Sequence, residues 1–106
     1  MSALIAFSTV ADEAGAKRLA RTLVEEGLAA CVNRIPRIVS TYHWKGAVCD
    51  EPEVLLVIKT TSERFDALKA RLVELHDYEV PELVAIEVSA GLPDYLAWVA
   101  EETRPA

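Results

Sequence analysis

Two short stretches of the chain are apolar at nearly every position, and they constrain its fold more than any other feature. They are residues 3–8, with the sequence ALIAFS, and residues 54–59, with the sequence VLLVIK. A strand with one wet face alternates apolar and polar residues, whereas a strand covered on both faces does not. We therefore predict two central strands, each buried on both faces of a sheet.

A helix is predicted after each of these strands. Thr9 and Asp12 have the spacing of a capping box, and Gly27 is the expected end of the first helix. Its apolar stripe recurs at helical intervals and comprises Ala16, Leu19, Ala20, Leu23 and Val24. Thr60 and Glu63 form the capping box of the second helix. The stripe of that helix comprises Phe65, Leu68, Leu72 and Leu75.

Two further strands complete the pattern. One runs over residues 30–44 and contains Pro36, which cannot donate to a β-ladder and so predicts a sheet edge or a bulge. A turn around Gly46 joins it to the next strand. The other strand covers residues 82–89. A short last helix begins near Pro93 and carries Tyr95, Trp98 and Val99.

The order of strand, helix, strand, strand, helix, strand is that of the split βαβ, ferredoxin-like fold. The apolar strands belong in the middle of its sheet, and the strand with Pro36 belongs at an edge. We predict an α+β fold with an antiparallel sheet, both helices on one face, and an added C-terminal helix. A chain of 106 residues is expected to form one such domain over residues 1–106.

Composition excludes several classes of function. Eleven basic and seventeen acidic residues give a net charge of −6, which argues against a nucleic-acid partner. No basic leader starts the chain and no apolar run approaches the roughly 20 residues of a membrane helix, so we expect a cytoplasmic protein without a membrane partner. The hydrophobic fraction of 52% is high for this length, so part of the apolar surface is expected to face another copy of the chain.

The connection over residues 75–82, with the sequence LHDYEVPE, is richer in reactive groups than its structural role requires. It places an imidazole, a phenol and three carboxylates around one proline, whereas a helix-to-strand turn needs one or two turn residues. His76 with Glu79 and Glu82 offers nitrogen and oxygen ligands suited to zinc or copper. The alternative is a helix-terminal histidine stabilised by the helix dipole.

Four groups of residues resemble the signatures of the CutA divalent-cation-tolerance family. They are Ala29-Ala30-Cys31-Val32-Asn33 with Pro36, Ser40, Tyr42 and Trp44; Lys59-Thr60-Thr61; the segment His76 to Glu82; and Tyr95-Leu96-x-Trp98. The resemblance covers nearly the whole chain. Asp77 stands where this family usually has a proline, and it adds a carboxylate to the segment.

This resemblance implies a cytoplasmic homotrimer of ferredoxin-like subunits, linked to tolerance of copper and other divalent cations. The partners are then other copies of the chain and divalent metal ions. The family has no accepted enzymatic reaction. The sequence itself offers no Ser/His/Asp or Cys/His spacing and no glycine-rich phosphate loop, so we predict a protein that is not an enzyme and has no organic cofactor.

The predicted metal-contacting set is Cys31, His76 and Glu82. The resemblance makes Cys31 the favoured candidate for a copper ligand, since a soft thiolate selects Cu(I). Its alternative role is that of a small hydrophobic residue at a strand start, and Cys49, near the hairpin turn, is the weaker candidate. Because these residues are distant in sequence, we expect the set to assemble across a subunit boundary.

A second set of residues is predicted to line an inter-subunit cleft or interface: Tyr42, Trp44, Lys59, Tyr78 and Trp98. Aromatic rings at such positions line a cleft or bury at an interface. Lys59 ends a central strand, so its ammonium is expected to reach solvent or to pair with a carboxylate, for which Glu82 is the candidate. A two-residue turn at residues 46–47 would place His43 opposite Asp50.

Two other functions remain open from the sequence. One is a trimeric sensor resembling the PII signalling proteins, which share this fold and bind small ligands in clefts between subunits; that hypothesis rests on fold analogy. The other is a passive structural trimer that binds no ligand.

Overall fold

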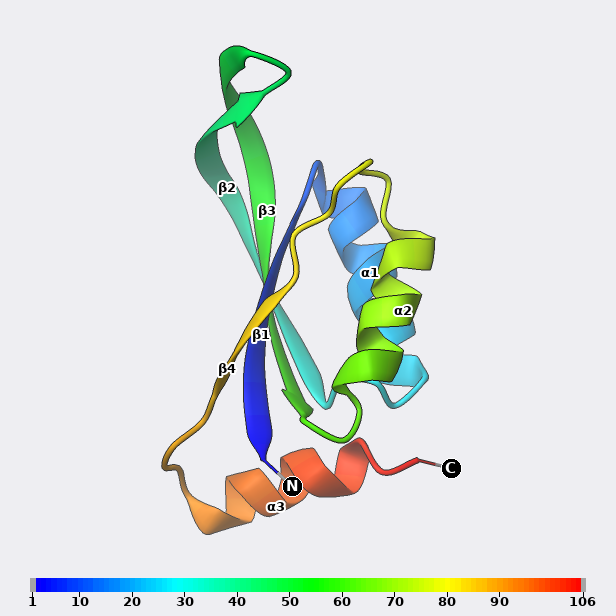
Figure 1. Cartoon of the computed structure of the whole chain (residues 1–106). Coiled ribbons are helices and arrows are strands. Elements are labelled where there is room, and N and C mark those ends of the chain that lie inside the picture. Colours follow the sequence, from blue (N-terminus) through cyan, green and yellow to red (C-terminus); the bar gives the residue numbers. More distant parts are fainter. Residues whose placement is uncertain (1, 106) are drawn as a thin grey trace.

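The computed structural model describes residues 2–105. The elements follow in the order β1 (Ala3–Val10), α1 (Glu13–Glu25), β2 (Cys31–Trp44), β3 (Ala47–Thr61), α2 (Phe65–Leu75), β4 (Val84–Glu87) and α3 (Pro93–Glu102). The strands form one antiparallel sheet with the order β2-β3-β1-β4. Helices α1 and α2 lie on one face of this sheet, and α3 lies across one end of it (Figure 1). The predicted ferredoxin-like arrangement, with β1 and β3 central and β2 at an edge, is confirmed.

The core lies between the two helices and the inner face of the sheet, which is the face toward α1 and α2. Alternate residues of β1 and β3 point into it, and Ala6, Leu56 and Ile58 are fully buried. Leu23 of α1 and Leu68 of α2 meet them and are also fully buried. The other face of both strands is only half-buried, so the single chain provides one of the two buried faces that the apolar runs predict.

The predicted bounds of α1 are corrected at its start and confirmed at its end. Thr9 does not cap the helix because β1 continues to Val10, and Asp12 is the N-cap, its carboxylate accepting the Gly15 N–H at 2.8 Å. Gly27 follows the helix with a φ of 70°, as expected of its C-terminal stop. Val24, predicted to be in the core, is 42% exposed because it lies at the margin of the stripe.

The predicted capping box of α2 is wrong. Thr60 belongs to β3, where its buried hydroxyl donates to the carbonyl of Leu28 at 2.7 Å. The N-cap is Arg64, which makes no side-chain capping bond. The predicted core stripe is correct in its centre, since Leu72 is fully buried, whereas Phe65 is partly buried. A tertiary hydrogen bond therefore replaces the local one that the spacing predicts.

Strands β2 and β3 extend past the end of β1 as a two-stranded arm (Figure 1). We call residues 38–53 the hairpin arm. At its base the β2–β3 ladder is interrupted between Ile35 and Ile38, and Arg37 has a φ of 62°. Pro36 lies in this interruption, so the predicted bulge in an edge strand is confirmed.

The turn of the hairpin arm is formed by Lys45 and Gly46, with φ angles of 50° and 83°, and Trp44 pairs with Ala47. Positive φ at both central residues fits the tight hairpin turn that matches strand twist. The predicted turn was one residue too late. His43 therefore pairs with Val48 and not with Asp50.

No helix in the described part of the chain has both the length and the apolar character needed to cross a bilayer.

Candidate functional site

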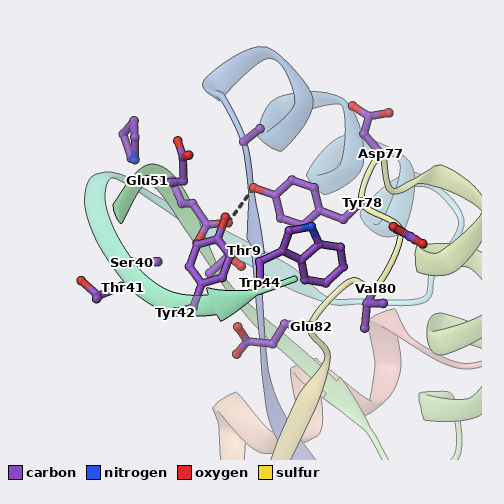
Figure 2. A pocket seen from close by; sticks show the side chains of 14 residues that line it. Thr9, Ser40, Thr41, Tyr42, Trp44, Glu51, Asp77, Tyr78, Val80 and Glu82 are labelled. Atoms are coloured by element: carbon purple, nitrogen blue, oxygen red, sulfur yellow. Dashed lines mark hydrogen bonds between the residues drawn. The ribbon is translucent and has the colours of Figure 1, made fainter. Parts of the chain in front are cut away.

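A cleft of about 790 Å³ lies between the hairpin arm and residues 77–82, the connection from α2 to β4 (Figure 2). Five carboxylates line it: Glu51, Glu53, Asp77, Glu79 and Glu82. Three aromatic residues join them: Tyr42, Trp44 and Tyr78. No lysine or arginine is among the described residues that line it. The cleft is therefore a negatively charged cavity with aromatic walls.

The hairpin arm contributes the aromatic wall through strand alternation. Tyr42 and Trp44 are two residues apart in β2, so their side chains share one side of the arm. Across the ladder, Tyr42 pairs with Cys49 and Ser40 pairs with Glu51, which places Glu51 on the same side. Partial desolvation, followed by the nearby negative groups, raises the pKa of the Tyr42 phenol.

Glu53 and Tyr78 tie the two walls of the cleft together. The Tyr78 hydroxyl donates to Oε2 of Glu53 at 2.6 Å (Figure 2), and the Glu53 residue is only 7% exposed. Burial, and then the hydrogen bond to this carboxylate, raise the pKa of the Tyr78 phenol well above its ordinary value. Tyr78 thus remains a protonated donor that holds the connection against the arm.

His76 ends α2 and forms a structural contact with β1. Its backbone N–H donates to the carbonyl of Leu72, and its Nε2 lies 2.8 Å from the carbonyl oxygen of Thr9. Its Nδ1 accepts the Tyr78 N–H at 3.1 Å. These partners assign a neutral imidazole with the proton on Nε2. Both ring nitrogens are occupied by backbone groups.

Two weak ion pairs flank the cleft. The Lys45 ammonium lies 3.9 Å from the Glu79 carboxylate and 5.7 Å from the centroid of the Trp44 ring. Arg18 of α1 lies 3.9 Å from the carboxylate of Asp77. All four charged side chains are at least 60% exposed, so neither pair contributes much to stability.

Cys31 and Lys59 lie at the opposite end of the sheet. They are partners in the β2–β3 ladder, and the Lys59 ammonium is 4.0 Å from the Cys31 sulfur. That ammonium donates to the side-chain oxygen of Asn33 and not to Glu82. The reason is topological, because β1 separates β3 from β4, the strand that Glu82 precedes.

The three predicted metal ligands do not meet within one chain. Cys31 lies level with Ile5 of β1, because both pair with Lys59. Glu82 is hydrogen-bonded to Ser8 and His76 to Thr9, which are three and four positions further along β1. Three residues of strand span about 10 Å. The described residues contain no group of three His, Cys, Asp or Glu side chains able to hold a metal ion.

Trp98 also lies away from the cleft, on α3. Its ring is 5.7 Å from that of Tyr95, and the phenol of Tyr95 has a raised pKa through burial and then through the nearby Cys31. Of the predicted cleft residues, the three aromatic ones from the hairpin arm and the 77–82 connection line one cavity. Lys59 lies beside Cys31, and Trp98 lies beside Tyr95 on α3.

Sequence reasoning missed Glu51 and Glu53, which carry much of the charge of the cleft. The available signal was the ladder itself. With the turn placed at Lys45 and Gly46, pairing puts Glu51 opposite Ser40 and Glu53 opposite Ile38, on the side that carries Tyr42. A turn placed one residue later shifts each pairing by two positions and sets Tyr42 opposite Glu51, so alternation places both glutamates on the Tyr42 side with either turn.

Comparison with known proteins gives matches over almost the whole chain. A family model described as "CutA1 divalent ion tolerance protein" matches residues 4–102. The chain is 47% identical over 95 residues to a protein of Thermus thermophilus named "Divalent-cation tolerance protein CutA", covering 90% of this chain and 92% of that protein. It is 48% identical over 99 residues to "Protein CutA" of Mus musculus, of which it spans only 56%.

Solved structures match equally well. A crystal structure of CutA from Xylella fastidiosa has a TM-score of 0.95 at 42% identity and covers 98% of this chain and 100% of that one. A crystal structure of CutA1 from Oryza sativa has a TM-score of 0.96 at 39% identity, covering 100% of this chain and 97% of that one.

Proposed function

The chain belongs to the CutA1 divalent ion tolerance family, and from that premise we propose that it acts in divalent-cation tolerance as a homotrimer that binds copper or another divalent cation. The observation that carries this proposal is the match of residues 4–102 to the family, joined to 47% identity with a divalent-cation tolerance protein of nearly equal length.

The outer sheet face, which points away from α1 and α2, supports the trimer. Its apolar side chains are contiguous through the ladder, since Ile86 pairs with Ile5, and Val84 pairs with Phe7, which pairs with Val57. Val84 and Ile86 are 54% and 57% exposed. Soluble monomers rarely expose a contiguous apolar patch of this kind, so another copy is the partner that this face fits.

The hairpin arm supports the same assembly. Beyond β1 it has only two strands, and an isolated two-stranded hairpin is marginally stable in water. Val39 and Val48 on the arm are 71% and 63% exposed. In the proposed trimer a neighbouring copy covers these side chains.

The proposed metal site depends on this assembly. Cys31 lies on the outer sheet face and is half-buried, so a neighbouring copy is needed to bring His76 and Glu82 to its sulfur. The imidazole nitrogens of His76 are hydrogen-bonded to Thr9 and Tyr78, and a metal must displace one of these contacts. Thiolate, imidazole and carboxylate together suit several divalent ions without strong selectivity.

In this proposal the protein binds its ligand without transforming it, and it acts in the cytoplasm. The relative from Arabidopsis thaliana is named chloroplastic, and a neighbour from Archaeoglobus fulgidus is titled periplasmic. Fractionation of cells followed by detection of the chain tests the compartment.

Two measurements test the trimer and the metal site separately. Sedimentation equilibrium should give three times the chain mass of 11.6 kDa, and a monomer at micromolar concentration would contradict the trimer. Calorimetric titration of copper should show binding that the double change Cys31→Ser and His76→Ala abolishes. The matched control is Cys49→Ser with His43→Ala, which removes the same groups outside the set. Unchanged copper affinity in the first variant, with the trimer intact, places any metal elsewhere.

The cleft favours a second function, that of a PII-like sensor of small molecules. Its volume of about 790 Å³ falls in the range of ligand pockets. Its five carboxylates, however, disfavour the phosphates of a nucleotide. Titration of adenine nucleotides tests this function directly, and a chain that binds neither metal nor small molecule would be left with a structural role.

A further inference from the structure

We propose that the cleft between the hairpin arm and the 77–82 connection binds a small organic cation with an ammonium group, held by Glu53 and the ring of Trp44. The two groups that carry this proposal, Glu53 and Trp44, are not part of the metal set proposed above, with which the cleft shares Glu82.

No lysine, arginine or histidine of the described chain forms an ion pair with the carboxyl group of Glu53. Only 7% of the surface of this residue is exposed, and the residue lines the cleft. Tyr78 donates to its Oε2, whereas no hydrogen bond or ion pair among the described residues reaches its Oε1. Oε1 is not among the fully buried orphan atoms of the described chain, so it is open to the cleft, where an ammonium group can donate to it.

The arrangement of the other carboxylates favours an organic cation over a metal ion. Glu51, Asp77, Glu79 and Glu82 are exposed and spread around the wall. No three such groups in the described chain converge as metal ligands must. A cavity of about 790 Å³ also has room for a molecule of many atoms.

The aromatic wall supplies the second element of ammonium recognition. The faces of tryptophan and tyrosine rings attract ammonium groups, and quaternary ammonium ligands bind in cages of such rings. Trp44 and Tyr42 are about 40% exposed on the side of the arm that faces the cleft. The chain's own Lys45 already places an ammonium 5.7 Å from the Trp44 centroid and 3.9 Å from Glu79.

A charged probe and its uncharged isostere test the proposal. Choline is titrated calorimetrically into the full chain, beside 3,3-dimethylbutan-1-ol, which has the same shape with a carbon in place of the charged nitrogen. We expect choline to bind at millimolar or lower concentration and the alcohol to bind at least about tenfold more weakly. Equal binding of the two would overturn the proposal, because shape and apolar contact would then suffice.

Two variants locate the site. Glu53→Gln keeps the side-chain shape and should weaken choline binding about tenfold, whereas Glu63→Gln makes the same charge change outside the cleft and should have no effect. Trp44→Leu leaves the contact between Glu53 and Tyr78 in place and should weaken binding several-fold. Equal effects of the two glutamine variants would assign the binding to net charge and reject the cleft.

A copper arm separates this site from the metal site. The Cys31→Ser variant, which lacks the sulfur of the proposed metal set, should bind choline as tightly as the copper-free wild type does, and copper should not change that affinity. The diamine putrescine is titrated in the same way as a second organic cation. If neither choline nor putrescine binds at tens of millimolar, the site is rejected. A neighbouring copy that fills the cleft would give this same result.

Discussion

The helix-covered face of the sheet and the hairpin arm differ in how completely one chain buries their side chains. On the helix-covered face, Leu56 and Ile58 have no exposed surface. On the arm, Val39 is 71% exposed and Trp44 is 40% exposed. Strands β2 and β3 belong to both regions: one part of each strand lies in the four-stranded sheet, and the other part forms the arm (Figure 1).

This difference indicates where each kind of function resides. The covered face satisfies its apolar groups within the chain, so its residues determine folding. The arm and the 77–82 connection leave an acidic, aromatic cleft and exposed apolar side chains. Those groups gain their partners from outside the chain, either another copy or a ligand.

The largest effect is expected in the covered core. Leu56→Ala removes a fully buried side chain and should lower the free energy of unfolding by about 2–5 kcal/mol. Val73→Ala, at a site of α2 that is 59% exposed, should change it by no more than about 0.5 kcal/mol. Urea denaturation measures both, and equal losses would mean that burial in the single chain does not determine stability.

The second-largest effect is expected in the mass of the oligomer in solution. Ile86→Asp places a charge on the outer sheet face and should convert the proposed trimer to a monomer, because a charge buried without a partner is costly. Val73→Asp adds the same charge to the exposed face of α2 and should leave the mass unchanged. Sedimentation velocity distinguishes them, and a trimer that persists with Ile86→Asp would remove the outer sheet face from the interface.

The predictable part of the fold came from signals with a direct geometric meaning. Uninterrupted apolar runs place β1 and β3 in the middle of the sheet, because only central strands tolerate them. Pro36 marks an interruption of an edge ladder since it has no N–H to donate. Gly27 ends α1 in the left-handed conformation that a glycine adopts most readily.

The unpredictable part depended on tertiary partners. Thr60 has the spacing of a helix cap, yet it bonds to Leu28, which is 32 residues away. Glu53 was missed because its burial depends on Tyr78, which is 25 positions away and donates to its carboxylate. His76 was interpreted as a ligand or a charged helix end, and neither hypothesis includes its bond to Thr9, because sequence spacing does not reveal a contact over 67 positions.

Tyr78 provides a pH-dependent test of the join between the two regions. Tyr78→Phe removes the bond to Glu53 and should cost about 1–2 kcal/mol at neutral pH. The raised pKa of Tyr78 means that the folded state holds a proton that the unfolded state loses near pH 10. The stabilisation should therefore be constant below about pH 10 and decline as the pH rises further, through the folded pKa.

Denaturation of the wild type and Tyr78→Phe at a series of pH values measures this difference. The control is Tyr42→Phe, which retains the hydrogen bond between Tyr78 and Glu53. This variant should still lose most of the stability that the wild type loses as the pH rises. A gap between wild type and Tyr78→Phe that does not shrink in alkali would show that the phenol proton has no part in holding the connection to the arm.

The smallest effect compares the two histidines, one in each region. His76→Ala removes the hydrogen bonds to the Thr9 carbonyl and the Tyr78 N–H and should cost about 1–2 kcal/mol. His43 is exposed on the hairpin arm, so His43→Ala should change stability by no more than about 0.5 kcal/mol. Hydrogen exchange separates a specific contact from a general loosening, because the Tyr78 amide should lose protection in His76→Ala while amides of β1 and β3 keep theirs. Equal stability losses from the two variants, or an unchanged Tyr78 amide, would mean that His76 does not fix the end of α2 to β1.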